Sequence, residues 1–290
     1  MPELPEVESV RRSLEPRLVG ARIESVVVVR ADVVTGPSPG GLCAAVDLLE
    51  KDVVARLERR GKQLALIGRS GRVVVVQLGM SGQLVFGDRV FGGGGGALAK
   101  EARHVHAVWR TRAGELWFRD PRRFGGITAL ADERSLRTRW QALGPDGLSV
   151  SGDDLCRALG ASRRAVKAGL LDQSAVAGIG NIYADEALFM AGIAPRRLCT
   201  RVRESEWDRL AEALRETLRN AIAHGGSTLR DYVDGNGQPG AYRSLHVVYG
   251  RGGEPCVRCG RVLSAAVIAQ RTTVWCKSCQ RMKVLPLSPH

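Results

Sequence analysis

The chain has 290 residues, of which 44% are hydrophobic and 25% charged, which is the composition of a folded protein long enough for more than one domain. It carries 43 Lys and Arg against 30 Asp and Glu, and the net charge of +13 favours a polyanionic partner such as nucleic acid. The sequence holds no run of about 18 apolar residues and begins with an acidic segment, so it predicts neither a transmembrane span nor a secretory signal.

The first 131 residues predict one helix followed by a β-rich domain. A helix over 3–18 carries an apolar stripe of Val7, Val10, Leu14 and Leu18, and Gly20 ends it. Short β-type runs follow at 23–30, 53–60, 63–68, 73–80, 82–86, 104–110 and 115–120. Their close spacing favours a sandwich or barrel over alternating βαβ units. The pentaglycine at 92–96 predicts the tip of a hairpin.

The rest of the chain predicts a linker, a helical domain and a small terminal module. Residues 132–148 are polar and rich in turn residues, and we expect them to link the domains. Helices are expected within 149–240, the longest over 204–224, with an apolar stripe of Trp207, Leu210, Leu214, Leu218 and Ile222. The segment 233–242 has the composition of a mobile loop. Short strands within 241–285 complete an α+β multidomain protein.

Four of the seven cysteines form a strong metal-binding pattern. Cys256 and Cys259 make one C-x2-C pair, and Cys276 and Cys279 make a second pair after sixteen residues. Two such turns close a tetrahedron around Zn²⁺, and ligation by four Cys leaves no open position, so we expect one structural zinc ion. Arg271 lies between the pairs, near the tip of an expected β-hairpin, where its guanidinium could reach a phosphate.

Further chemistry is concentrated in the first half of the chain. Removal of Met1 would expose the secondary amine of Pro2, which titrates near pH 8 and is nucleophilic at neutral pH. Glu3 could act beside it as a general acid–base group, although acidic residues are common in any first helical turn. The turn before Asn181 contains Gly178 and Gly180 and opens a helix, which is typical of anion binding.

Three residues are ambiguous from local pattern alone. Lys62 is expected at a turn between two strands, where basic side chains usually face solvent. Met80 is most simply a core methionine. Phe124 stands between two arginines and two glycines, and an exposed aromatic side chain on a basic loop can wedge into a base stack.

Taken together, these segments resemble the formamidopyrimidine-DNA glycosylase family from end to end. The matching segments, in order, are PELPEVE, RRGKQL, LGMSG, DPRRFG, GIGNIYADE, GGSTLRDY, GQPGAY and AQRTTVWCKSC. The resemblance implies an N-terminal β-sandwich domain (1–131), a helix–two-turn–helix domain (149–240) and a C-terminal zinc finger (241–285). It also implies a monomer that repairs double-stranded DNA with oxidised purines or abasic sites, in the bacterial cytoplasm at the nucleoid.

The resemblance assigns roles to individual residues. Pro2 would form a Schiff base with C1′ of the damaged nucleotide, and Glu3 would be the general acid for opening of the sugar ring. Lys62 would support β-elimination, and Arg271 would assist δ-elimination. The residues implied to fill the void left by the extruded base are Met80, Arg122 and Phe124. The implied phosphate contacts are His104, Arg123 and Asn181, with Arg163 as a further DNA contact.

The sequence departs from the family pattern at two places, and two alternative functions are considered beside this hypothesis. The family often has Lys-Pro where this chain has Lys167-Ala168, and the pentaglycine is not a family feature. The near alternative is an endonuclease VIII-type enzyme that acts on oxidised pyrimidines with the same nucleophile. The other is a zinc protein that binds damaged DNA without catalysis, which would need neither a free Pro2 nor Glu3.

Overall fold

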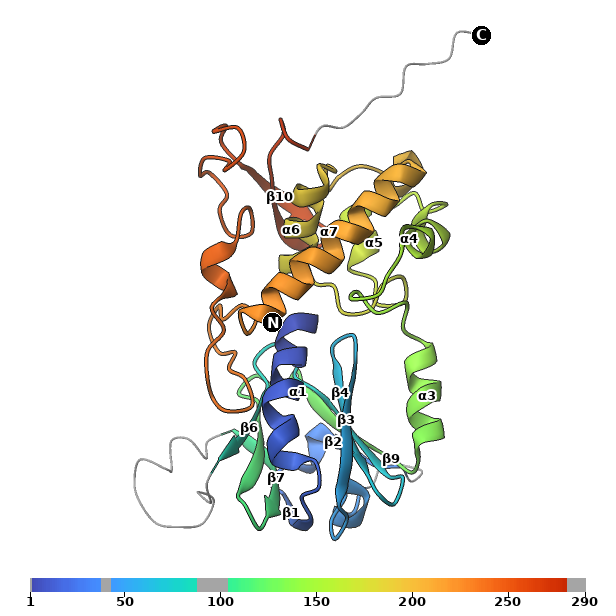
Figure 1. Ribbon diagram of the computed structural model, residues 1–290, viewed down its shortest axis with the longest axis vertical. Helices are drawn as coiled ribbons and strands as arrows, with labels where there is room; N and C mark the ends of the chain where they lie inside the picture. Colours follow the sequence, from blue (N-terminus) through green and yellow to red (C-terminus); the bar gives the residue numbers. More distant parts are fainter. Residues whose placement is uncertain (1, 38–42, 88–103, 281–290) are drawn as a thin grey trace. The chain divides into compact units, whose positions relative to one another are not determined.

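A computed structural model describes residues 2–37, 43–87 and 104–280 of the chain (Figure 1). The chain divides into two compact units, Met1–Ala142 with Ala221–Arg243, and Leu143–Asn220 with Ser244–His290. Within the described ranges, no helix is long and apolar enough to cross a membrane. The pentaglycine at 92–96 lies outside the described residues.

The first unit opens with helix α1 (Leu4–Leu18), as predicted from its apolar stripe. Glu3 is the N-cap residue, and Pro5 stands in the first turn, where a missing N–H costs nothing. The predicted stripe, Val7, Val10, Leu14 and Leu18, is buried in the core of this unit. Strands β3 (Val54–Arg60) and β6 (Gln83–Gly87) contact the helix, which is drawn in dark blue in Figure 1.

Two β-sheets enclose this core. One has the order β1-β7-β8-β6, built from β1 (Ile23–Val28), β7 (Val105–Thr111), β8 (Glu115–Arg119) and β6 (Gln83–Gly87). The other has the order β2-β9-β5-β4-β3, built from β2 (Val34–Thr35), β9 (Gly126–Leu130), β5 (Val73–Gln77), β4 (Gln63–Gly68) and β3 (Val54–Arg60). All pairings are antiparallel except β2 with β9. The core draws residues from both sheets, which confirms the predicted sandwich.

The outer face of the second sheet is covered by helix α3 (Glu133–Gln141). Ala65, Ile67 and Val75 of the sheet pack against Leu136 of this helix. Strands β4 and β5 are therefore buried on both faces, which explains their nearly continuous apolar sequence. The segment predicted as a linker, 132–148, thus begins with a capped helix, in which Asp132 accepts from the Ser135 N–H at 2.7 Å.

The second unit is helical and ends in a β-hairpin. Its helices are α4 (Gly152–Leu159), α5 (Val166–Leu170), α6 (Asn181–Ala191) and most of α7 (Glu204–Ala223), and the hairpin strands are β10 (Ser264–Ile268) and β11 (Arg271–Trp275). Short 3₁₀ helices occur in both units: Ala31–Val33 and Ala45–Leu48 lie in the first, Cys199–Arg201 lies in the second, and Tyr242–Leu245 spans the division between them. The apolar stripe predicted for α7 is buried throughout.

Candidate functional site

The first unit contains a cavity of about 390 Å³ that brings Pro2 and Lys62 together. Pro2 precedes α1, and Lys62 lies in the two-residue turn between β3 and β4, as predicted. Gly61 allows this tight turn because its φ is +55°. Phe124 lines the same cavity. One cavity is therefore lined by Pro2, the expected nucleophile, together with Lys62 and Phe124.

A buried carboxylate fixes the backbone beside Pro2. One oxygen of Glu6 accepts from the Glu3 N–H at 2.7 Å, and the other accepts from the Ser227 N–H at 2.7 Å. A Cβ atom on Gly226 would lie 2.8 Å from the Glu6 carboxylate, and the φ of Gly226 is +82°. Glu6 thus joins the start of α1 to the segment after α7, and glycine is required where the two meet.

Tyr232 reinforces this connection. Its hydroxyl lies 3.2 Å from the Glu6 carbonyl oxygen and 3.0 Å from the Gly225 carbonyl oxygen. Burial, and then the negative charge of Glu6, raise the pKa of Tyr232 well above its ordinary value. The phenol therefore remains a protonated donor at neutral pH.

A second buried carboxylate connects α1 to the strand that precedes Lys62. Glu8 accepts from Arg59 at 3.0 Å, and their side chains are 9% and 7% exposed. Arg11 and Arg12 also donate to Glu8, at 3.0 and 2.8 Å. Burial alone would raise the pKa of Glu8, but these guanidinium groups lower it to about 2. The ion pair between Glu8 and Arg59 thus connects the helix that follows Pro2 to the strand that precedes Lys62.

The three predicted void-filling side chains project from two adjoining loops. Met80 is 40% exposed, so its interpretation as a core methionine was wrong. Phe124 is 59% exposed, as predicted, and the guanidinium carbon of Arg122 lies 5.1 Å from the centre of its ring. An exposed methionine, aromatic ring and arginine on one basic surface are suited to insertion into a base stack.

His104 and Arg123 line a second hollow, of about 540 Å³, together with Arg30. Both predicted phosphate contacts are exposed, and both have left-handed backbones, with φ of 72° and 55°. Asp32 accepts from Arg30 at 3.0 Å and from Arg123 at 3.4 Å, and the Arg30 hydrogen bond is the main reason for its lowered pKa. A phosphate group would compete with Asp32 for these guanidinium groups.

In the second unit the predicted DNA contacts Asn181 and Arg271 lie near one another. Asn181 is the first residue of α6 and follows the N-cap Gly180, so it is not the capping residue. Its side-chain amide instead donates to the Thr272 carbonyl oxygen at 3.0 Å. Arg271 is exposed beside the hairpin tip, where both turn residues, Ala269 and Gln270, have positive φ.

A buried ion pair holds the strand that begins with Arg271. Lys167 of α5 and Asp185 of α6 lie 2.6 Å apart with fully buried side chains. Lys167 also donates to the Thr273 hydroxyl at 2.7 Å, and Asp185 accepts from the Val274 N–H at 3.0 Å. Both partners thus hold strand β11. Arg163 lies on the exposed turn before α5, and nothing in its surroundings distinguishes it as a DNA contact.

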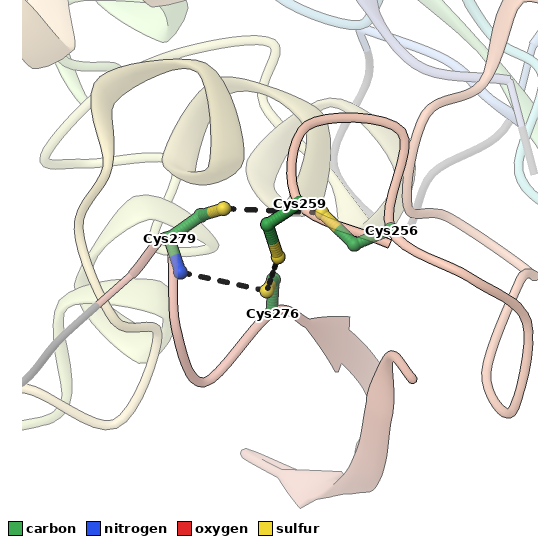
Figure 2. A group of neighbouring side chains, drawn as sticks. All are labelled: Cys256, Cys259, Cys276 and Cys279. Atoms are coloured by element: carbon green, nitrogen blue, oxygen red, sulfur yellow. Dashed lines mark hydrogen bonds between the residues drawn. The ribbon is translucent and has the colours of Figure 1, made fainter. Parts of the chain in front are cut away.

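The four paired cysteines converge at the end of the hairpin (Figure 2). Their sulfur atoms all lie within 4.8 Å of one another, and two of the separations are 3.9 Å (Cys256 to Cys279) and 3.5 Å (Cys259 to Cys276). Sulfur atoms of a tetrahedral zinc site with 2.3 Å bonds are about 3.8 Å apart, so this donor set fits one structural Zn²⁺. Cys256 and Cys276 pack with Phe189 of α6, which connects the metal site to the helical core.

The long-range contacts that orient this site were not predicted from the sequence. Glu6 and Glu8 have local partners at helical spacing, but each also accepts from a group far away in the sequence, the Ser227 N–H and Arg59, and no local spacing signals these contacts. The only nearby residue in the sequence that hints at a role for Arg30 is Asp32, to which it donates a hydrogen bond. These residues are recognised by burial and by shared hydrogen bonds.

Three family models match consecutive parts of the chain. The formamidopyrimidine-DNA glycosylase N-terminal domain matches residues 1–127, and the formamidopyrimidine-DNA glycosylase H2TH domain matches residues 143–233. The zinc finger found in FPG and IleRS matches residues 253–281, which include all four paired cysteines.

Similar proteins span almost the whole chain. The formamidopyrimidine-DNA glycosylase of Xanthomonas oryzae pv. oryzae is 44% identical over 284 residues, which are 97% of this chain and 100% of that protein. The crystal structure of the MutM (Fpg) protein from Thermus thermophilus has a TM-score of 0.81 at 38% identity, covering 96% of this chain and 98% of that one. A Lactococcus lactis Fpg mutant in complex with Fapy-dG-containing DNA has a TM-score of 0.85 at 30% identity, covering 97% and 100%.

Proposed function

Because the chain belongs to the formamidopyrimidine-DNA glycosylase family, we propose that it is a DNA glycosylase of base excision repair that removes oxidised purines and then cleaves the abasic site. The Lactococcus lactis relative is described with Fapy-dG-containing DNA, which supports an oxidised purine as the substrate. Its place of action would be the bacterial cytoplasm. The observation that best supports catalysis, as opposed to binding alone, is the cavity shared by Pro2 and Lys62.

Pro2 would act as the nucleophile once Met1 is removed. Its amine lone pair attacks C1′ of the extruded nucleotide, the bond from C1′ to the base breaks, and the base leaves with a proton. Glu3 is buried at the adjacent position and would donate a proton to the ring oxygen O4′ as the sugar opens. The product is an iminium ion between Pro2 and C1′, a Schiff base of a secondary amine.

In the β-elimination that follows, the Glu3 carboxylate, ionised after giving its proton to O4′, would accept a proton from C2′ while the bond from C3′ to the 3′ phosphate oxygen breaks. Lys62 would hold that phosphate and support this step, since its ammonium is a compact positive charge at the same cavity. Arg271 would grip the backbone and assist the second elimination, which releases the 5′ phosphate.

The remaining side chains would bind and deform the duplex. Met80, Arg122 and Phe124 would fill the space left by the extruded nucleotide, with Arg122 facing the orphaned cytosine. His104, Arg123 and Asn181 would contact phosphates. The zinc ion, when bound, holds the hairpin that carries Arg271 and leaves no coordination position for substrate.

Borohydride trapping tests the proposal. The protein is incubated with a duplex carrying 8-oxoguanine opposite cytosine, and reduction should capture a covalent adduct. The matched control carries one Ala inserted between Met1 and Pro2, which converts the Pro2 amine into an amide and should abolish both trapping and strand cleavage.

Two outcomes contradict the proposal. Binding without any trapped adduct would indicate a non-catalytic damage-binding protein. Preferential excision of 5-hydroxycytosine over 8-oxoguanine would indicate the endonuclease VIII-type activity.

A further inference from the structure

Asp120 is a fully buried carboxylate that takes no part in the proposed chemistry. It directly follows strand β8. One of its oxygens accepts from the Ser81 hydroxyl at 2.6 Å and from the Arg122 N–H at 3.2 Å. The other accepts from the Gly125 N–H at 2.7 Å. A single carboxylate thus joins the loop that carries Met80 to the loop that carries Arg122 and Phe124.

The two loops also touch through their backbones. A Cβ atom on Gly79 would lie 2.3 Å from the Gly125 nitrogen and from the Phe124 carbonyl carbon. A Cβ atom on Gly125 would lie 2.5 Å from the Gln77 carbonyl oxygen. Neither loop can shift alone without breaking this contact.

The main chain of Asp120 is equally constrained. Its N–H donates to the His104 carbonyl oxygen at 3.0 Å, and its own carbonyl oxygen lies 2.8 Å from Nε2 of His106. The same oxygen accepts from the Arg123 N–H at 3.3 Å. Arg123 has a φ of 55°, so the turn after Asp120 holds a conformation that its own residues disfavour. Asp120 therefore fixes the path of the whole loop.

We propose that Asp120 is the positioning residue that holds Met80, Arg122 and Phe124 as one preformed wedge for entering the DNA stack. This inference rests on the proposed function, because it assigns a support to the side chains that would replace the extruded base. The three tips are solvent-accessible, whereas the Asp120 and Ser81 side chains that connect their loops are buried. Binding then need not order either loop, and the interaction energy is available for unstacking the DNA.

Hydrogen-bond chemistry makes Asn a poor substitute for Asp120. Its partners, the Ser81 hydroxyl and the two backbone N–H groups, all donate, so both side-chain oxygens must accept. In Asp120→Asn the amide NH₂ would face one of these donors. Ser81→Ala removes the hydrogen bond to Asp120 and the one that Ser81 Oγ accepts from the Arg122 N–H at 3.2 Å, but it leaves both backbone hydrogen bonds of the carboxylate in place and is the milder perturbation. Asp132→Asn is the matched control, because Asp132 also accepts from a serine but caps α3.

The experiment compares two DNAs. The first is a duplex with 8-oxoguanine opposite cytosine and 2-aminopurine beside the lesion, whose fluorescence rises when the stack opens. The second is a single strand with a preformed abasic site, which needs no wedge. In Asp120→Asn we expect excision from the duplex to fall about 100-fold and the fluorescence rise to disappear, since small displacements of positioning groups cost that much. Trapping on the single strand should remain at the wild-type level.

Ser81→Ala should give a smaller loss on the duplex alone, and Asp132→Asn should match the wild type on both DNAs. Duplex excision at the wild-type rate in Asp120→Asn would overturn the inference, and so would a parallel loss on both DNAs. If Asp120→Asn does not fold, Ser81→Ala decides by the same comparison. Absence of trapping by the wild type would instead refute the proposed function.

Discussion

The ion pair between Glu8 and Arg59 should contribute measurably to stability, and Glu8→Gln tests this. Glu8 accepts hydrogen bonds from three arginines, and its own side chain is 9% exposed. Glutamine keeps the shape of the side chain but removes the negative charge. The buried Arg59 guanidinium, with a side chain 7% exposed, then loses the charge of the Glu8 carboxylate, and removing one charge of a buried ion pair is strongly destabilising.

The size of the effect follows from the pKa of Glu8. The surrounding guanidinium groups outweigh the effect of burial and lower this pKa from 4.5 to about 2. Since each pKa unit corresponds to about 1.4 kcal/mol, ionised Glu8 contributes about 3 kcal/mol at pH 7. The folded pKa is depressed, so this stability is present above pH 4.5 and is lost as the pH falls towards 2.

Urea unfolding of the wild type and Glu8→Gln at pH 7 and pH 3 measures this contribution. The difference in free energy of unfolding should be about 3 kcal/mol at pH 7 and about 1 kcal/mol at pH 3. Glu15→Gln is the control on the same helix, because Glu15 is 46% exposed and pairs only at the surface. It should cost less than about 1 kcal/mol. Equal stability of Glu8→Gln and wild type at pH 7, or a difference that grows in acid, would refute the reasoning.

Three further predictions concern the second unit and DNA binding. Cys276→Ser should release zinc and weaken DNA binding while the β-sandwich stays folded; full metal content by atomic absorption would contradict it. Asp185→Asn removes the negative charge that faces the buried Lys167 and should lower the free energy of unfolding by about 3–5 kcal/mol, so an unchanged urea midpoint would count against it. With about six phosphate contacts, log affinity should fall with log salt at a slope of about −5, and a slope near zero would exclude a mainly electrostatic interface.

Features with a local cause were predictable from the sequence. The stripe of α1 repeats at helical spacing, and all four of its residues are buried. The paired C-x2-C spacing alone indicated the zinc site. Lys62 was expected at a turn, and Arg271 beside a hairpin tip, because short β-type runs lie on either side of each turn. In each case the information lies within a few residues of the feature.

Features that depend on tertiary packing were not predictable in this way. Helix α3 forms in a polar segment because Leu136 covers the outer face of a sheet. Strand β9 was not predicted, and it is held by pairing with β5. Met80 resembles a core residue in sequence and is exposed because its loop is joined to another loop through Ser81 and Asp120, which are 39 residues apart. No local pattern records such contacts.

The placement of charge links stability to the proposed function. Of the 30 acidic residues, nine are buried in the described part of the chain, whereas only two of the 43 basic residues are buried there. Glu6, Glu8 and Asp120 are among the buried acids, and each accepts from backbone or guanidinium donors that orient the proposed site. The carboxylates that organise the interior are thereby removed from the surface. The side chains outside the interior therefore include a larger excess of basic over acidic groups than the net charge of +13, which favours a polyanionic partner.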